Sequence, residues 1–153
     1  MTRLSVRRRM QAAPAAVVRS LEDPPAWLGP EAGDPPAGLR RFQTDLRLRV
    51  SEEPSIVTFR KAAYVDLGPV APTADGWELE VSWRPATLTP LFPVFSGSIV
   101  LKGQEATLTG LYASPTLVGR LADLTLLRIA ALGTGRWLLA TLDQAATESG
   151  RRA

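Results

Sequence analysis

The clearest pattern in the chain is a strict alternation of apolar and polar positions between residues 40 and 50. Successive side chains of a strand point to opposite faces, so this segment is predicted to be a half-buried strand. One face carries Phe42, Thr44, Leu46, Leu48 and Val50, and the other carries Arg41, Gln43, Asp45, Arg47 and Arg49.

Three further segments are predicted to be strands. Residues 77–84 alternate in the same way, with Trp77, Leu79, Val81 and Trp83 on one face. Residues 3–10 also alternate, although Arg8 falls on the apolar side with Leu4, Val6 and Met10. A strand is expected over residues 56–66 as well, but its Arg-Lys pair at positions 60 and 61 interrupts both possible apolar faces. Which of its faces is buried therefore stays open.

The segment FSGSIVLKGQEATLTGLY is predicted to be a hairpin that turns at Gly103-Gln104, because glycine as the first of two turn residues suits a type II′ turn. This register sets Lys102 opposite Glu105, a favourable pair of charges, and thereby fixes every other cross-strand pair. The pairs that follow are Leu101–Ala106, Ile99–Leu108, Gly97–Gly110 and Phe95–Tyr112. The two facing glycines predict a notch, and strand glycines often mark the close approach of a ligand or another backbone.

Two helices are predicted. A short one begins at about Pro14, whose fixed φ suits a first helical turn, and includes Val17, Val18 and Leu21. Residues 23–38 are rich in proline and glycine and form a connector. A long amphipathic helix follows the N-cap Ser114 and runs from residue 115 to about residue 146. Its inward stripe comprises Leu117, Leu121, Leu124, Ala131, Gly135, Leu138 and Leu142.

Two features of the long helix ask for an explanation. Gly133 and Gly135 each cost about 1 kcal/mol relative to alanine, and position 138 lacks the glycine that would complete a dinucleotide fingerprint. Gly135 lies in the inward stripe and is predicted to admit a close neighbour or a ligand, although a biased composition also supplies such glycines.

Arg128 falls in the centre of the same stripe. It would grip an acidic ligand, pair with an internal acid such as Asp66, or lean to the helix edge.

The composition narrows the possible chemistry. The chain has 153 residues, the size of one domain, and contains neither cysteine nor histidine. Disulfides, thiol nucleophiles, Ser-His triads and most zinc or iron sites are therefore excluded, and neither a cofactor nor a metal is expected. The net charge of +3 comes mainly from arginine in a chain rich in alanine and proline. That mix indicates genome composition, so no nucleic-acid partner is expected.

The N-terminal arginines precede a small apolar run, as in a targeting peptide, but Pro14 breaks that run. The most apolar segment, residues 117–142, carries four charged side chains that would be costly within a bilayer. A cytoplasmic protein without a membrane span is therefore predicted.

The order of these elements resembles that of the START-like superfamily, which includes the polyketide cyclases and is also called SRPBCC. The stretch RRRMQAAPAAVVRSLEDPPAWLG is similar to the first strand and helix of that family, and GLYASPTLVGRLADLTLLRIA to its last strand and closing helix. The resemblance implies an α+β helix-grip fold, in which a curved antiparallel sheet of about six strands wraps a long C-terminal helix. Residues 1–148 would form this single domain, and residues 149–153 would be a disordered tail.

The same resemblance implies a cavity for lipids, polyketides or other apolar molecules, and catalysis in some members, but no catalytic residue carries over. We therefore predict binding of a small apolar or amphiphilic, lipid- or polyketide-like molecule between the concave sheet and the C-terminal helix. The residues expected to line the cavity are Phe42, Thr44, Leu46, Trp77, Leu79, Trp83, Phe95, Tyr112, Leu124 and Arg128. These side chains would equally fill a plain core.

Two other functions stay open at this point. One is a cyclase or hydrolase in the same cavity, with Tyr112 or a carboxylate as acid or base, although the pattern contains no pair of inward carboxylates. The other is a protein-interaction domain. The outer face of the long helix is unusually apolar, and a homodimer through Leu126, Ile129 and Trp137 would bury it.

Overall fold

The computed structural model of the chain describes residues 1–49, 58–87, 92–114 and 124–152. The elements, in chain order, are β1 (Thr2–Arg9), α1 (Pro14–Glu22), the 3-10 turn η1 (Pro24–Ala26), β2 (Arg40–Arg49), β3 (Thr58–Leu67), β4 (Ala71–Pro72), β5 (Gly76–Pro85), β6 (Val94–Lys102), β7 (Glu105–Ala113) and α2 (Leu124–Arg152). Among the described residues, neither helix is long and apolar enough to cross a membrane.

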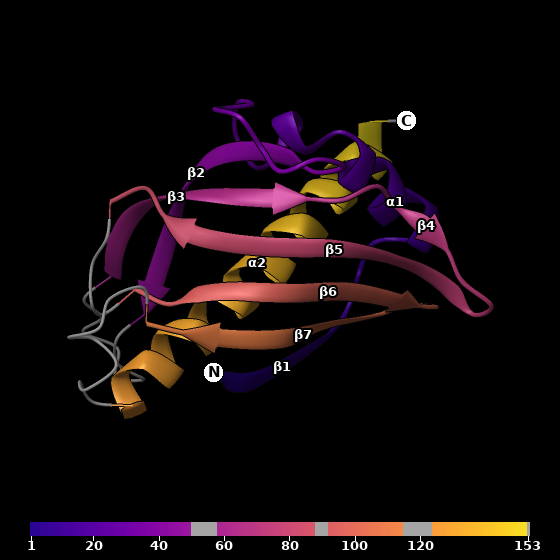
Figure 1. Cartoon of the computed structure of the whole chain (residues 1–153). Coiled ribbons are helices and arrows are strands. Elements are labelled where there is room, and N and C mark those ends of the chain that lie inside the picture. Colours follow the sequence, from indigo (N-terminus) through magenta and orange to yellow (C-terminus); the bar gives the residue numbers. More distant parts are fainter. Residues whose placement is uncertain (50–57, 88–91, 115–123, 153) are drawn as a thin grey trace.

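The strands form one antiparallel sheet in the order β1-β7-β6-β5-β3-β2, and the two-residue β4 pairs with β5 as a seventh strand. Figure 1 shows the sheet curving around α2, which crosses its concave face diagonally from the end of β7 toward α1. The predicted α+β helix-grip fold is therefore confirmed. The six long strands are those expected from the sequence, and β4 was not predicted.

The register of the β6–β7 hairpin is the predicted one. Lys102 lies opposite Glu105, which places Gly97 opposite Gly110. Gly103 has a φ of 57°, whereas its neighbour in the turn has no positive φ, as a type II′ turn requires. Local turn chemistry therefore determined the pairing of both strands.

The buried face of β3 is now resolved. Ala63, Val65 and Leu67 are all within 3% of complete burial on the concave side. Asp66 lies on the opposite face, where its carboxylate accepts hydrogen bonds from Arg41 at 2.8 Å and 3.0 Å. The charge of Asp66 is tolerated on the convex face because Arg41 of the neighbouring strand β2 forms an ion pair with it.

Helix α2 continues without a break through Gly133 and Gly135, as predicted, while positions 115–123 of the expected helix lie outside the described residues. A Cβ atom added to Gly135 would lie 3.0 Å from Leu108 Cδ2 and 3.1 Å from Val6 Cγ2. The glycine therefore lets β1 and β7 approach the helix closely. A disordered tail was predicted for residues 149–153, but the helix extends to Arg152, so the prediction is wrong for residues 149–152, and residue 153 lies outside the described residues.

The side of α2 that is buried changes along its length. Buried positions include Leu127, Ala131, Leu138, Leu142 and Ala146, with a spacing that is mostly four. At 100° per residue, the buried stripe turns by about 100° around the helix between the first and the last of these. A helix that crosses a twisted sheet diagonally presents different sides to the sheet at its two ends.

The prediction that Arg128 points inward is wrong for this reason. Arg128 is exposed, because one phase does not hold along the whole helix: Arg128 is in phase with buried Ala146 but about 100° away from buried Leu127. The two inward roles considered for it, contact with an acidic ligand and pairing with Asp66, both fall. Asp66 bonds Arg41 instead.

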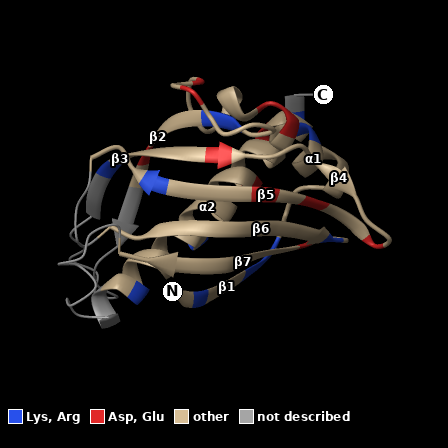
Figure 2. Cartoon of the chain, in the orientation of Figure 1, with Lys and Arg blue, Asp and Glu red and all other residues tan. Residues whose placement is uncertain are grey.

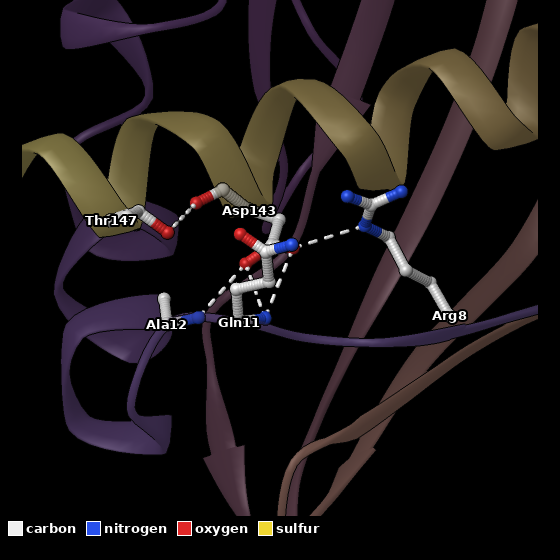
Figure 3. Close-up of polar contacts among 5 residues, drawn as sticks. All are labelled: Arg8, Gln11, Ala12, Asp143 and Thr147. Atoms are coloured by element: carbon white, nitrogen blue, oxygen red, sulfur yellow. Dashed lines mark hydrogen bonds and ion pairs between the residues drawn. The ribbon is translucent and has the colours of Figure 1, made fainter.

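A polar cluster fastens the start of α1 to α2 (Figure 3). Asp143 on α2 is 2% exposed, and its carboxylate accepts hydrogen bonds from the backbone N–H groups of Gln11 and Ala12, each at 3.0 Å. The guanidinium of Arg8 donates a further bond at 3.1 Å. Arg8, which falls on the apolar side of the first strand, therefore finds its partner on the C-terminal helix.

Opposing effects act on the acidity of Asp143. Burial raises its pKa, but the hydrogen bonds from Ala12 and Gln11 and the guanidinium of Arg8 together lower the pKa more, so the net shift is downward. Helix α1 has no side-chain cap at Ala13. The ionised carboxylate of Asp143 instead bonds the N–H groups that precede this helix, and so ties α1 to α2.

Candidate functional site

The backbone of α2 lies away from the centre of the concave face. Within the described part of the chain, the backbone of α2 comes close to α1, β2, β1 and β7, whereas it meets β3, β5 and β6 at isolated positions at most. The helix therefore approaches the sheet mainly near its two edges, and buried side chains of the central strands lie on the face between them.

The largest of these side chains lie in one line across the sheet. Direct cross-strand pairing runs from Phe42 to Val65, then to Trp83, Phe95 and Tyr112, which come from β2, β3, β5, β6 and β7. All five are at most 3% exposed. We call this line the aromatic rung. It crosses the sheet near the end where β5 and β7 finish and β6 begins, on the side of the molecule where α2 starts (Figure 1).

Trp83 and Phe95 stack face to face in the rung. Their ring centroids are 4.2 Å apart and their planes are inclined by 19°, an almost parallel stack. Phe95 also leans along the sheet: its Cζ atom lies 2.8 Å and 2.7 Å from the Cβ positions that side chains at Gly97 and Gly110 would have. The glycine notch predicted from the sequence therefore exists, and it accommodates the ring of Phe95.

The indole N–H of Trp83 is buried and finds no acceptor among the described residues. The indole N–H of Trp27, by contrast, donates to the carbonyl oxygen of Ser20 at 2.7 Å. An unpaired buried donor costs about 1–3 kcal/mol, and most buried polar atoms in proteins have a partner. The one unpaired buried side-chain donor of the described residues thus lies in the aromatic rung.

A polar rim lies beyond the rung. Lys61 faces the concave side, in line with Leu46 across from it on β2, and its Nζ atom donates to the Thr87 hydroxyl at 2.7 Å. Figure 2 shows that β6 and β7 otherwise carry charge only near the turn that joins them. The concave side therefore carries one ammonium group, that of Lys61, four residues along β3 from Val65 of the rung.

The structure brings together part of the predicted lining. Phe42, Trp83, Phe95 and Tyr112 share the rung, and Thr44 lies two residues farther along β2. Leu46 and Leu79 lie on the same concave face and are fully buried.

Three predicted lining residues lie apart from this group. Trp77 is half-buried at the other end of β5, opposite Leu101. Six residues of strand separate it from Trp83, or about 20 Å. Leu124 begins α2, but its side chain is outside the described part, and Arg128 is exposed.

The carboxylates needed for acid–base catalysis are engaged elsewhere. Asp66 and Asp143 are the buried acids of the described residues, and both accept hydrogen bonds from arginine. No group of acidic residues that could hold a metal ion occurs in the described part of the chain. Of the catalytic groups considered for the cavity, Tyr112 alone lies in the rung.

The outer face of α2 is less apolar than its sequence indicates. Ala130 is buried and Trp137 packs against the core, whereas Ile129 is 39% exposed. The side chain of Leu126 lies outside the described residues. A homodimer through this face stays a prediction. It would bury less exposed apolar surface than the sequence pattern indicates.

The chain was also compared with known proteins. No protein-family model matches the sequence, and no curated protein sequence matches it either. Among solved structures, the chain is similar to the crystal structure of the protein TTHA0849 from Thermus thermophilus, with a TM-score of 0.48 and 14% sequence identity over 97% of this chain and 99% of that chain.

Proposed function

We propose that the protein binds a small apolar or amphiphilic molecule between the concave sheet and α2, against the aromatic rung. The observation that carries this proposal is the rung itself, in which Trp83, Phe95 and Tyr112 adjoin on three neighbouring strands. Apolar walls with a few polar groups are typical of small-molecule sites. The START-like resemblance of the sequence, with its lipid- or polyketide-like ligands, and a cytoplasmic location fit the same proposal.

The rim supports an amphiphilic ligand. An apolar body would lie against Trp83 and Phe95, while a polar head would extend toward Lys61 and Thr87, which already form a polar contact at 2.7 Å. Lys61 thereby takes the place that the sequence had suggested for Arg128. An ammonium group at a half-exposed rim suits a carboxylate or phosphate head without the cost of a fully buried charge.

Binding should be slow. The rung is at most 3% exposed, so a ligand enters only after the surrounding side chains move apart. We expect an association rate constant below about 10⁵ M⁻¹s⁻¹, since binding that requires a conformational change falls below the usual range. Stopped-flow quenching of tryptophan fluorescence by fluorene, a flat apolar probe, measures this rate.

Native mass spectrometry of the purified protein tests the proposal. The expected spectrum shows a stoichiometric small-molecule adduct that disappears after denaturation, and the same spectrum reports whether the chain is a dimer. A bare protein mass, together with no detectable binding of added fluorene, would overturn the proposed function.

A further inference from the structure

The buried indole N–H of Trp83, which has no partner among the described residues, indicates what chemical class of ligand the site would bind. An indole offers a donor and no acceptor, and the side chains in register on either side, Val65 and Phe95, are apolar. Trp83 itself is 2% exposed. The donor is therefore shielded from bulk water, and it has no acceptor among the residues that the structure describes.

We propose that Trp83 Nε1 is the polar anchor of the ligand site, and that the ligand is a flat, largely apolar molecule whose carbonyl or similar acceptor receives this hydrogen bond. The inference rests on the proposed function and adds the chemical class of the ligand. Trp83 and Phe95 already pack here as nearly parallel flat rings, with centroids 4.2 Å apart, and a planar ring system would pack against this stack. A ligand whose polar groups are donors alone gains nothing from Trp83.

A matched pair of probes isolates this bond. Fluorene and fluorenone have the same flat tricyclic skeleton, and fluorenone adds one carbonyl acceptor. Isothermal titration of both probes gives the preference of the protein for the ketone. Trp83→Phe keeps an aromatic ring and removes the donor, and Trp77→Phe makes the same change on the same face of the same strand, six residues away.

In wild-type protein and in Trp77→Phe, the preference for fluorenone over fluorene should be the same. In Trp83→Phe that preference should fall by about 2- to 12-fold, the factor that corresponds to one hydrogen bond of ordinary net strength. An unchanged preference in Trp83→Phe, with both probes still bound, overturns the inference and leaves the proposed function standing. If neither probe binds wild-type protein, the proposed function falls and the inference with it.

A second measurement needs no variant that must fold. In a proton–nitrogen correlation spectrum of the wild-type protein, the four tryptophan indoles give separate signals. Fluorenone should shift the Trp83 indole signal and slow its exchange with solvent more than fluorene does. Equal effects of the two probes on that signal would overturn the inference.

Discussion

Asp143 offers the sharpest test of how the fold is held together. Replacement by alanine removes the acceptor of two backbone N–H groups, that of Ala12, which is buried, and that of Gln11, which is partly buried. It also leaves Arg8 without its partner. Because the side chain of Arg8 is 38% exposed, water can solvate the guanidinium, and little of the cost comes from there.

The expected loss of stability in Asp143→Ala comes mainly from the two N–H groups. Each buried donor left unpaired costs about 1–3 kcal/mol, and the partly buried one less. We therefore expect Asp143→Ala to lower the free energy of unfolding by about 2–4 kcal/mol. For a chain of this length that corresponds to a fall in Tm of about 4–16 °C. Asp143→Asn keeps one oxygen that can accept from Gln11 and Ala12, and should cost less.

The pH dependence distinguishes the carboxylate from simple packing. The pKa of Asp143 is lowered on folding, so its contribution is fully present above the unfolded pKa, which is about 4, and is lost as the pH falls through the lower folded pKa. Urea unfolding of wild type and Asp143→Asn should thus show a difference that is constant near neutral pH and shrinks below about pH 4. Asp143→Ala as stable as wild type, or a difference independent of pH, would refute this role of the carboxylate.

Two further substitutions test packing and the second buried ion pair. Asp66→Ala should lower the free energy of unfolding in urea by about 1–3 kcal/mol, because it removes both bonds to Arg41. Asp75 forms an exposed ion pair with Lys102, so Asp75→Ala should change that free energy by no more than about 0.5 kcal/mol; equal effects would contradict the distinction. Gly135→Leu should destabilise by about 1–3 kcal/mol through overpacking against β1 and β7, while Gly150→Leu, where a Cβ atom meets nothing within 4 Å, should not. A Gly135→Leu protein with unchanged Tm would show that the helix does not approach the sheet as described.

Local chemistry explains which parts of the fold followed from the sequence. The hairpin register depended on Gly103 and on the charges beside it, all within one turn, and it was predicted correctly. The placement of Phe95 opposite Tyr112 followed from the same turn. Joining Phe42 and Trp83 to that pair required the order of the central strands and the facing of β3, which the interrupted pattern at Arg60 and Lys61 left open.

Long-range geometry explains what the sequence did not reveal. The exposure of Arg128 depends on the angle at which α2 crosses the sheet, and a fixed count of 100° per residue contains no such angle. The role of Asp143 was not predicted from the sequence. The available signal was Arg8 on the apolar side of its strand, but its partner is 135 residues away, beyond the reach of any local pattern.

Binding of a small molecule against the aromatic rung can be read residue by residue from a proton–nitrogen correlation spectrum of the labelled protein titrated with fluorene. We predict that the largest shifts fall on the Trp83 indole and on the backbone amides of Phe95 and Tyr112. Shifts confined to Trp77 or Trp137, or no shifts at all, would mean that the rung is core and not a binding site.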